Sequence, residues 1–83
     1  MTVIENNHEY TGGRYEKTDF SDQTIHGVVF EDCTFIRCDF SSAVAQQCRF
    51  TDCVVEQCNM SLLAGPGNRV FGTEFYGKKK DWF

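Results

Sequence analysis

The sequence predicts an all-β solenoid with a four-sided coil of about 20 residues. One observation is that every fifth residue from position 10 to position 60 is apolar. This centre frame consists of Tyr10, Tyr15, Phe20, Ile25, Phe30, Phe35, Phe40, Ala45, Phe50, Val55 and Met60. A second observation is that the residues two places earlier are small and apolar from position 28 onward. This small frame consists of Val28, Cys33, Cys38, Ala43, Cys48, Cys53 and Cys58.

A period of five fits neither an α-helix nor a flat strand, so we expect the chain to turn after each five-residue side. The large residue of each side should fill the middle of the coil, and the small residue should lie near the corner. Residues 20 positions apart should stack at the strand spacing of about 4.8 Å. Cys33 is therefore expected below Cys53, and Cys38 below Cys58.

All five cysteines fall in the small frame, where a thiol acts as a small buried hydrophobe. A zinc site or a disulfide is the alternative, and it is less favoured because CxxC and Cys/His spacings are missing. The first residues have no basic segment of the kind that begins a secretory signal. We therefore expect reduced thiols, a cytoplasmic protein, and neither a metal nor a cofactor.

Four segments show the repeat most clearly: TDFSD (18–22), CDFSS (38–42), CRFTD (48–52) and CNMSL (58–62). In this pattern the chain resembles the pentapeptide-repeat proteins, over about residues 8 to 62. In that family a small residue, then Asp or Asn, then Leu or Phe, precede two variable positions. The resemblance implies a right-handed quadrilateral β-helix, here of about three coils.

The two ends of the chain depart from the repeat. We expect an N-terminal cap at residues 1–9, the β-helix at 10–62, and a partial last coil with a C-terminal cap at 63–83. The register fails at Gly65 and returns at Val70 and Phe75. The last two residues, Trp82 and Phe83, should either fold back over the last coil or contact a second chain. We favour the fold-back, and hence a monomer, over a dimer formed through the tail.

The charge of the chain and the length of its apolar runs argue against two classes of protein. The chain has 8 Lys and Arg against 12 Asp and Glu, a net charge of −4. Residues 5–62 carry −6 and the remaining tail +2. A generic basic nucleic-acid binder is excluded because phosphate contacts need clustered Lys and Arg. A membrane span is not expected either, because no apolar run approaches about 18 residues.

Stacking the coils predicts an acidic outer surface for binding a partner. The candidate residues are Asp32, Asp52, Glu31, Glu56, Asp19, Asp22 and Asp39. Asp32 should lie below Asp52, and Asp19 below Asp39. For Asp19 and Asp39 the family pattern and solubility are sufficient reasons. Asp32 and Asp52 follow the centre frame by two positions, where the pattern asks for no acid, and they are the stronger candidates.

Motifs for catalysis are missing from the sequence. The two histidines are not part of a Ser/His/Asp arrangement, and neither a glycine-rich phosphate loop nor a metal motif is present. We therefore predict a protein that is not an enzyme and has no catalytic residue.

The acidic rod leads to a hypothesis of DNA mimicry. Three coils form a rod of roughly 15 Å, and B-DNA of that length carries about nine charges. The resemblance adds that members of the family act as duplex mimics, including proteins that bind DNA gyrase. We predict an inhibitor that occupies the DNA site of a basic protein complex, of the phage anti-CRISPR or anti-restriction type. The alternatives are a gyrase-binding protein, or an interaction module without mimicry.

Overall fold

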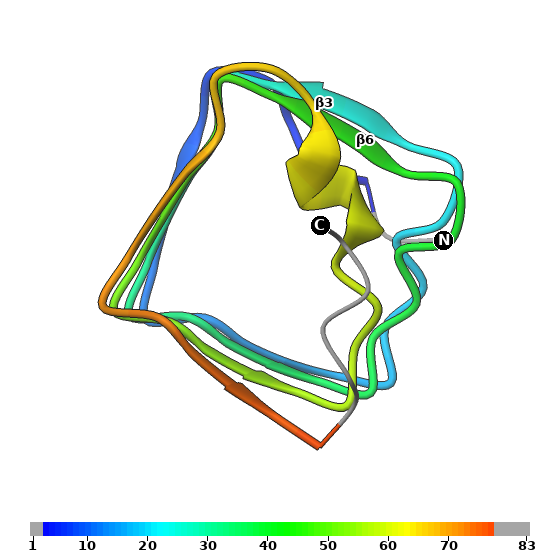
Figure 1. Ribbon diagram of the computed structural model, residues 1–83, viewed down its shortest axis with the longest axis vertical. Coiled ribbons are helices and arrows are strands. Elements are labelled where there is room, and N and C mark those ends of the chain that lie inside the picture. The colour runs from blue at the N-terminus through cyan, green and yellow to red at the C-terminus, as the bar shows by residue number, and fades with distance from the viewer. Residues whose placement is uncertain (1–2, 78–83) are drawn as a thin grey trace.

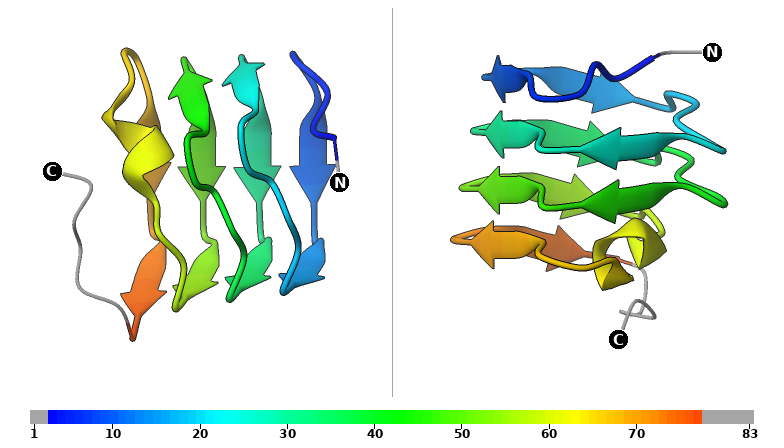
Figure 2. Two further views of the ribbon diagram at one scale, coloured as in Figure 1. Left: turned by 90° about the vertical axis from the view of Figure 1, so that its right-hand side faces the viewer. Right: turned by 90° about the horizontal axis from the view of Figure 1, so that it is seen from above.

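The computed structural model describes residues 3–77, which wind into successive coils of three-residue strands (Figure 1, Figure 2). The strands are β1 (Glu9–Thr11), β2 (Arg14–Glu16), β3 (Thr24–His26), β4 (Val29–Glu31), β5 (Thr34–Ile36), β6 (Val44–Gln46), β7 (Arg49–Thr51), β8 (Val54–Glu56), β9 (Arg69–Phe71) and β10 (Glu74–Tyr76). One 3₁₀ helix, η1 (Ser61–Ala64), lies between β8 and β9.

All strand pairs among these residues are parallel and join positions 20 residues apart. One sheet has the order β1-β4-β7-β9, a second β2-β5-β8-β10, and a third β3-β6. The fourth side of the coil is held by a parallel bridge between Asp19 and Asp39. Seen down its axis, the coil has four sides (Figure 1). The predicted all-β solenoid with stacked five-residue sides is confirmed.

The interior consists of the two inward frames. From Phe20 to Met60 every residue of the centre frame is buried, and so is the whole small frame. Aromatic rings stack along the axis, with ring centroids 5.1 Å apart for Phe20 and Phe40 and 5.0 Å apart for Phe30 and Phe50. Within one coil, Phe30 meets Phe35 edge to face at 5.2 Å. Such offset and edge-to-face contacts suit aromatic rings, which explains the many phenylalanines at the centre.

The corners of the coil form a third frame, two residues after the centre frame, in which the backbone is left-handed. Its members are Asn7, Gly12, Lys17, Asp22, Gly27, Asp32, Arg37, Ser42, Gln47, Asp52, Gln57, Gly67, Gly72 and Gly77, all with positive φ. The left-handed residue turns the chain into the next side. Position 62 breaks this frame, because Leu62 lies in η1.

Helix η1 explains why the apolar register fails at Gly65. Leu62 and Leu63 of η1 are both buried, so they add apolar side chains to the core near the end of the third coil. Gly65 then passes so close to β6 that a Cβ atom would lie 2.0 Å from the Ala45 carbonyl oxygen. The Asn68 side chain closes this region by donating to the carbonyls of Ala45 and Gly65 at 2.8 and 3.1 Å.

A partial fourth coil follows. Its two strands pair in register with the coil below, Val70 opposite Phe50 and Phe75 opposite Val55, as the sequence predicts. Residues 1–2 and 78–83 are outside the described part of the chain. The expected roles of Trp82 and Phe83 therefore stay predictions, as do the proposed boundaries of the caps. Within residues 3–77, no helix is long and apolar enough to cross a membrane.

Candidate protein-interaction surface

Asp32 and Asp52 occupy the corner between the β1-β4-β7-β9 and β2-β5-β8-β10 sheets, with Glu31 beside them at the end of β4. These three residues are called the acidic corner below. The Asp32 N–H donates to the Thr51 carbonyl at 3.0 Å, and the Asp52 N–H to the Phe71 carbonyl at 2.8 Å. These hydrogen bonds fix the two aspartates one coil apart, as the stacking argument predicts.

The left-handed backbone gives a structural reason for aspartate at this corner. Asp32 and Asp52 have φ values of 55° and 51°. Asp and Asn tolerate this conformation better than most residues, because their short side chains bond locally to the backbone. Conformation thus favours Asp or Asn here, but it does not require the negative charge.

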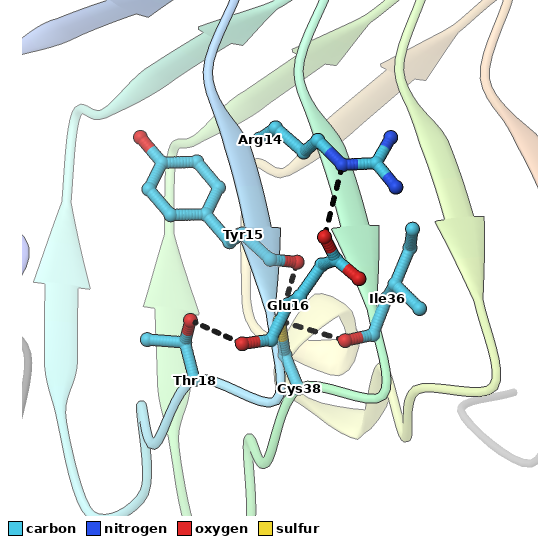
Figure 3. A network of polar contacts seen from close by, with 6 residues as sticks. All are labelled: Arg14, Tyr15, Glu16, Thr18, Ile36 and Cys38. Carbon is cyan, nitrogen blue, oxygen red and sulfur yellow. Dashed lines mark hydrogen bonds and ion pairs between the residues drawn. The ribbon is translucent and has the colours of Figure 1, made fainter.

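Within residues 3–77 the acidic corner makes no ion pair. Asp32 and Asp52 are like charges one coil apart, and like charges stacked in this way are unfavourable. Over residues 3–77 the one ion pair joins Arg14 and Glu16, 3.2 Å apart and exposed, on the first coil (Figure 3). The acidic corner is exposed to solvent, and Arg49, diagonally across from Glu31 on the neighbouring strand β7, makes no ion pair with it.

The remaining candidates lie elsewhere on the surface. Glu56 is at the far end of β8 from the acidic corner, in register with Ile36 and Tyr76. Asp19 and Asp39 are on the fourth side of the coil, and Asp22 is at the corner that follows them. The structure therefore groups the acids into two sets: the acidic corner with Glu56 on the adjoining side of the coil, and Asp19, Asp39 and Asp22 on the fourth side and the corner after it.

Basic residues lie between the two sets. Lys17 and Arg37 stack at the corner that joins the side of Glu56 to the side of Asp19 and Asp39. Their N–H groups bond one coil upward, to the carbonyls of Ile36 and Glu56 respectively. The acidic surface is thus interrupted by a basic corner.

Asp19 and Asp39 have local hydrogen-bonding roles. In both, Oδ1 accepts a hydrogen bond from the N–H of the serine two residues later, Ser21 or Ser41, at 2.9 Å. The hydroxyls of the same serines donate to the same oxygens. These bonds lower the pKa of Asp19 and of Asp39. Both carboxylates stabilise turns, which agrees with the structural reading of this pair.

The small frame has a hydrogen-bonding role that sequence reasoning missed. The Cys53 thiol donates to the carbonyls of Thr51, at 3.4 Å, and Phe30, at 3.3 Å. Cys38 does the same with Ile36 and Tyr15 (Figure 3). Thr73 continues the small frame beyond Cys58. Its hydroxyl donates to the equivalent carbonyls of Phe71 and Phe50, both at 3.2 Å. The signal available in the sequence was that Thr18 and Thr73 share the frame with the cysteines.

The cysteines do not form the alternative sites considered from the sequence. All five are free and buried. Among residues 3–77, no group of three or more potential metal ligands is present. Burial raises the pKa of the Cys53 thiol to about 11. The hydrogen bond with Cys38, together with burial, also raises the pKa of Cys58.

The raised pKa of the Cys53 thiol predicts a loss of stability at alkaline pH. The pKa of Cys53 is about 11 in the folded chain, above the ordinary value of 9.0, so the unfolded state releases its proton first as the pH rises. The stabilisation is complete below pH 9.0 and declines toward pH 11. We expect the urea concentration at the midpoint of unfolding, followed by circular dichroism, to decrease as the pH is raised from 9.0 to about 11. The decrease should be smaller in Cys53→Ser, whose hydroxyl does not titrate in this range. An equal decline in both proteins would contradict this account.

Comparison with known protein families agrees with the geometry. The family model for pentapeptide repeats matches residues 16–52 and 25–61, with eight copies of the repeat. The chain belongs to the pentapeptide-repeat family. No curated protein matches it at a significant level. In this pentapeptide-repeat protein each side of the coil presents outward residues in columns along the axis, and such columns suit a structural or interaction module.

Proposed function

We propose that this pentapeptide-repeat protein is a non-catalytic inhibitor that occupies the DNA-binding site of a nucleic-acid-handling complex, of the anti-CRISPR or anti-restriction type. The observation that carries the proposal is the acidic corner, where Asp32 and Asp52 stack in register beside Glu31 and make no ion pair among residues 3–77. The spacing of this column is set by the backbone, so the charges are held in place before a partner binds.

The charge density supports the comparison with DNA. Residues 3–77 contain eleven acids against five basic residues, a net charge of −6. The two stacked carboxylates, Asp32 and Asp52, lie about 4.8 Å apart along the axis, the strand spacing, whereas one DNA strand places a charge about every 3.4 Å. The acidic corner is thus sparser than a phosphate strand but is of the same order.

The partner implied is a protein with a basic DNA-binding surface, and nucleic acid itself is not a ligand. Complementary charges raise the association rate and make binding sensitive to salt. Duplex DNA should compete with the inhibitor because both would occupy the same site.

The test is a pull-down from host lysate with the tagged protein, washed at low and then at high salt, with duplex DNA as competitor. We expect a DNA-binding complex that either salt or DNA releases. The variant Asp32→Asn/Asp52→Asn should lose at least about tenfold in affinity for that complex, the effect expected when charges central to an interface are removed. Asn keeps the shape of the side chain and tolerates the left-handed corner, so the fold should persist.

The matched control is Asp19→Asn/Asp39→Asn, which removes two stacked charges on the other side of the basic corner. It should bind nearly as well as the unmodified protein. Capture of a partner that neither high salt nor duplex DNA releases would contradict the proposal. An equal loss of affinity in both double variants would also contradict it.

A further inference from the structure

Two pairs of cysteines stack one coil apart, Cys33 with Cys53 and Cys38 with Cys58. In the second pair the sulfur of the upper residue contacts the lower residue directly. The Cys38 N–H donates to the Cys58 sulfur at 3.2 Å. The two thiols of this pair are also hydrogen-bonded to each other. The pair Cys38 and Cys58 therefore brings two sulfur atoms together and is more than a stack of small side chains.

Cys38 and Cys58 are also the cysteines nearest to solvent. Their exposed fractions are 5% and 8%, whereas each of the other three is 1% exposed. Both begin the fourth side of the coil, where the bridge between Asp19 and Asp39 joins the first coil to the second. Among residues 3–77 it is the one isolated bridge, and the other three sides form sheets. Because sparsely paired backbone opens more easily than a continuous sheet, a small molecule reaches this pair most readily.

The two thiols of the pair differ in acidity. The hydrogen bond from Cys58 lowers the pKa of the Cys38 thiol from 9.0 to about 7, since it stabilises the thiolate. In the other stacked pair, burial raises the pKa of Cys53 to about 11. The thiolate, and not the thiol, is the nucleophile in cysteine chemistry. Near neutral pH, Cys38 is thus better prepared to react than Cys53.

We propose that Cys38 and Cys58 are a modification site at which a hydroperoxide oxidises the two thiols to a disulfide that joins the second coil to the third. The structure holds the reduced form, in which both thiols are free. Stacked residues lie about 4.8 Å apart along the axis, within the range of about 4.4–6.8 Å between Cα atoms that disulfides span. The inference concerns the interior of the coil, so it goes beyond the proposed function and does not depend on it.

The reaction consumes one hydroperoxide and two thiols. The Cys38 thiolate attacks one peroxide oxygen, the O–O bond breaks, and the leaving oxygen takes up the proton that Cys38 released. Cys38 is then a sulfenic acid. The Cys58 sulfur attacks the Cys38 sulfur, and the hydroxyl group leaves as water with the proton of the Cys58 thiol. The two sulfur atoms are oxidised to the disulfide, and hydrogen peroxide as the oxidant is reduced to water.

The hydrogen bonds of the reduced form make the modification reversible. The Cys38 thiol bonds to the carbonyls of Tyr15 and Ile36 at 3.3 and 3.6 Å (Figure 3). The Cys58 thiol is bonded to two carbonyls in the same way. Oxidation removes these donors. Because stabilisation of the reduced form favours reduction, a thiol reductant should open the disulfide easily.

The test exposes the folded full-length protein to a limited amount of hydrogen peroxide, blocks the remaining thiols and maps the peptides by mass spectrometry. Cleavage at basic and acidic residues together places each cysteine on its own peptide, because the chain can be cut at Arg37, Asp39, Arg49, Asp52 and Glu56. We expect one linked pair of peptides, joined through Cys38 and Cys58, that dithiothreitol separates. Its rate of formation should rise with pH and reach half its maximum at a pH of about 7, where Cys38 ionises.

The matched control is Cys33→Ser/Cys53→Ser, which removes the other stacked pair and should form the same linked peptides at an unchanged rate. Cys58→Ser should stop at the sulfenic acid of Cys38, which dimedone traps. Cys38→Ser should slow the oxidation of Cys58 at least about tenfold, because the remaining thiol has a raised pKa.

Linkage of Cys33 to Cys53 as fast as that of Cys38 to Cys58 would overturn the inference, because stacking alone would then explain the reaction. It would also be overturned if the thiols of the folded protein stay free while those of the urea-unfolded chain are oxidised. Both results come from the unmodified protein, so they do not depend on whether any variant folds.

Discussion

We expect Phe35→Ala to lower the free energy of unfolding by about 3–5 kcal/mol, the usual cost of truncating a buried phenylalanine. The Phe35 side chain is fully buried, with 0% exposed. Its ring stacks on Tyr15 at 5.2 Å and meets Phe30 and Phe40 edge to face at 5.2 and 5.8 Å. Truncation would remove contacts both along the axis and within one coil, leaving a cavity that short strands on four sides cannot easily close.

The measurement is urea unfolding followed by circular dichroism, with Phe71→Ala as the matched control. Phe71 is the same residue type but is half exposed. Its replacement should change the free energy of unfolding by no more than about 0.5 kcal/mol, as is usual for surface substitutions. A loss below about 1 kcal/mol for Phe35→Ala would mean that the centre of the coil is not tightly packed.

The second large effect is expected for Gly65→Ala, with a loss of about 1–3 kcal/mol from overpacking. The backbone at Gly65 has φ −67° and ψ 169°, which alanine adopts without strain. The obstacle is steric, because the new Cβ would lie 2.0 Å from the Ala45 carbonyl oxygen. That atom belongs to the backbone of β6, so the clash can be relieved only by moving η1 or the strand.

The matched control is Gly12→Asn, measured by the same urea unfolding. No atom lies within 4 Å of the position that a Cβ would take at Gly12. The φ value of 72° at Gly12 suits asparagine, which the chain already uses at the equivalent corner Asn7. We expect a change of no more than about 0.5 kcal/mol. Equal losses at both positions would show that the close approach to Ala45 does not limit what residue 65 can be.

The sequence by itself determined the coil, its register and its core. The reason is that the period of five is local: each side repeats the same inward and outward positions, so counting in steps of 20 places Tyr10 below Phe30 and Asp32 below Asp52. The same counting predicted the return of the register at Val70 and Phe75. A periodic pattern reports which way each side chain points, and stacking follows from it.

Only the tertiary structure decided the features that depend on neighbouring coils. Leu62 and Leu63 were not assigned to a 3₁₀ helix, because their fit depends on the space beside Ala45. In the small frame, a thiol or hydroxyl donates to a carbonyl 23 residues earlier, as Thr73 does to Phe50. A count of apolar positions gives no information about such hydrogen bonds.

For the interaction surface too, the sequence predicted one part and the structure was needed for the other. Stacking predicted that carboxylates would lie in columns, but not that the backbone is left-handed at Asp32 and Asp52, which gives aspartate a conformational reason to be there. The exposed fractions of Phe71 and Tyr76, 49% and 51%, also needed the structure. Periodicity specifies the direction of a side chain, whereas its exposure depends on what packs against it.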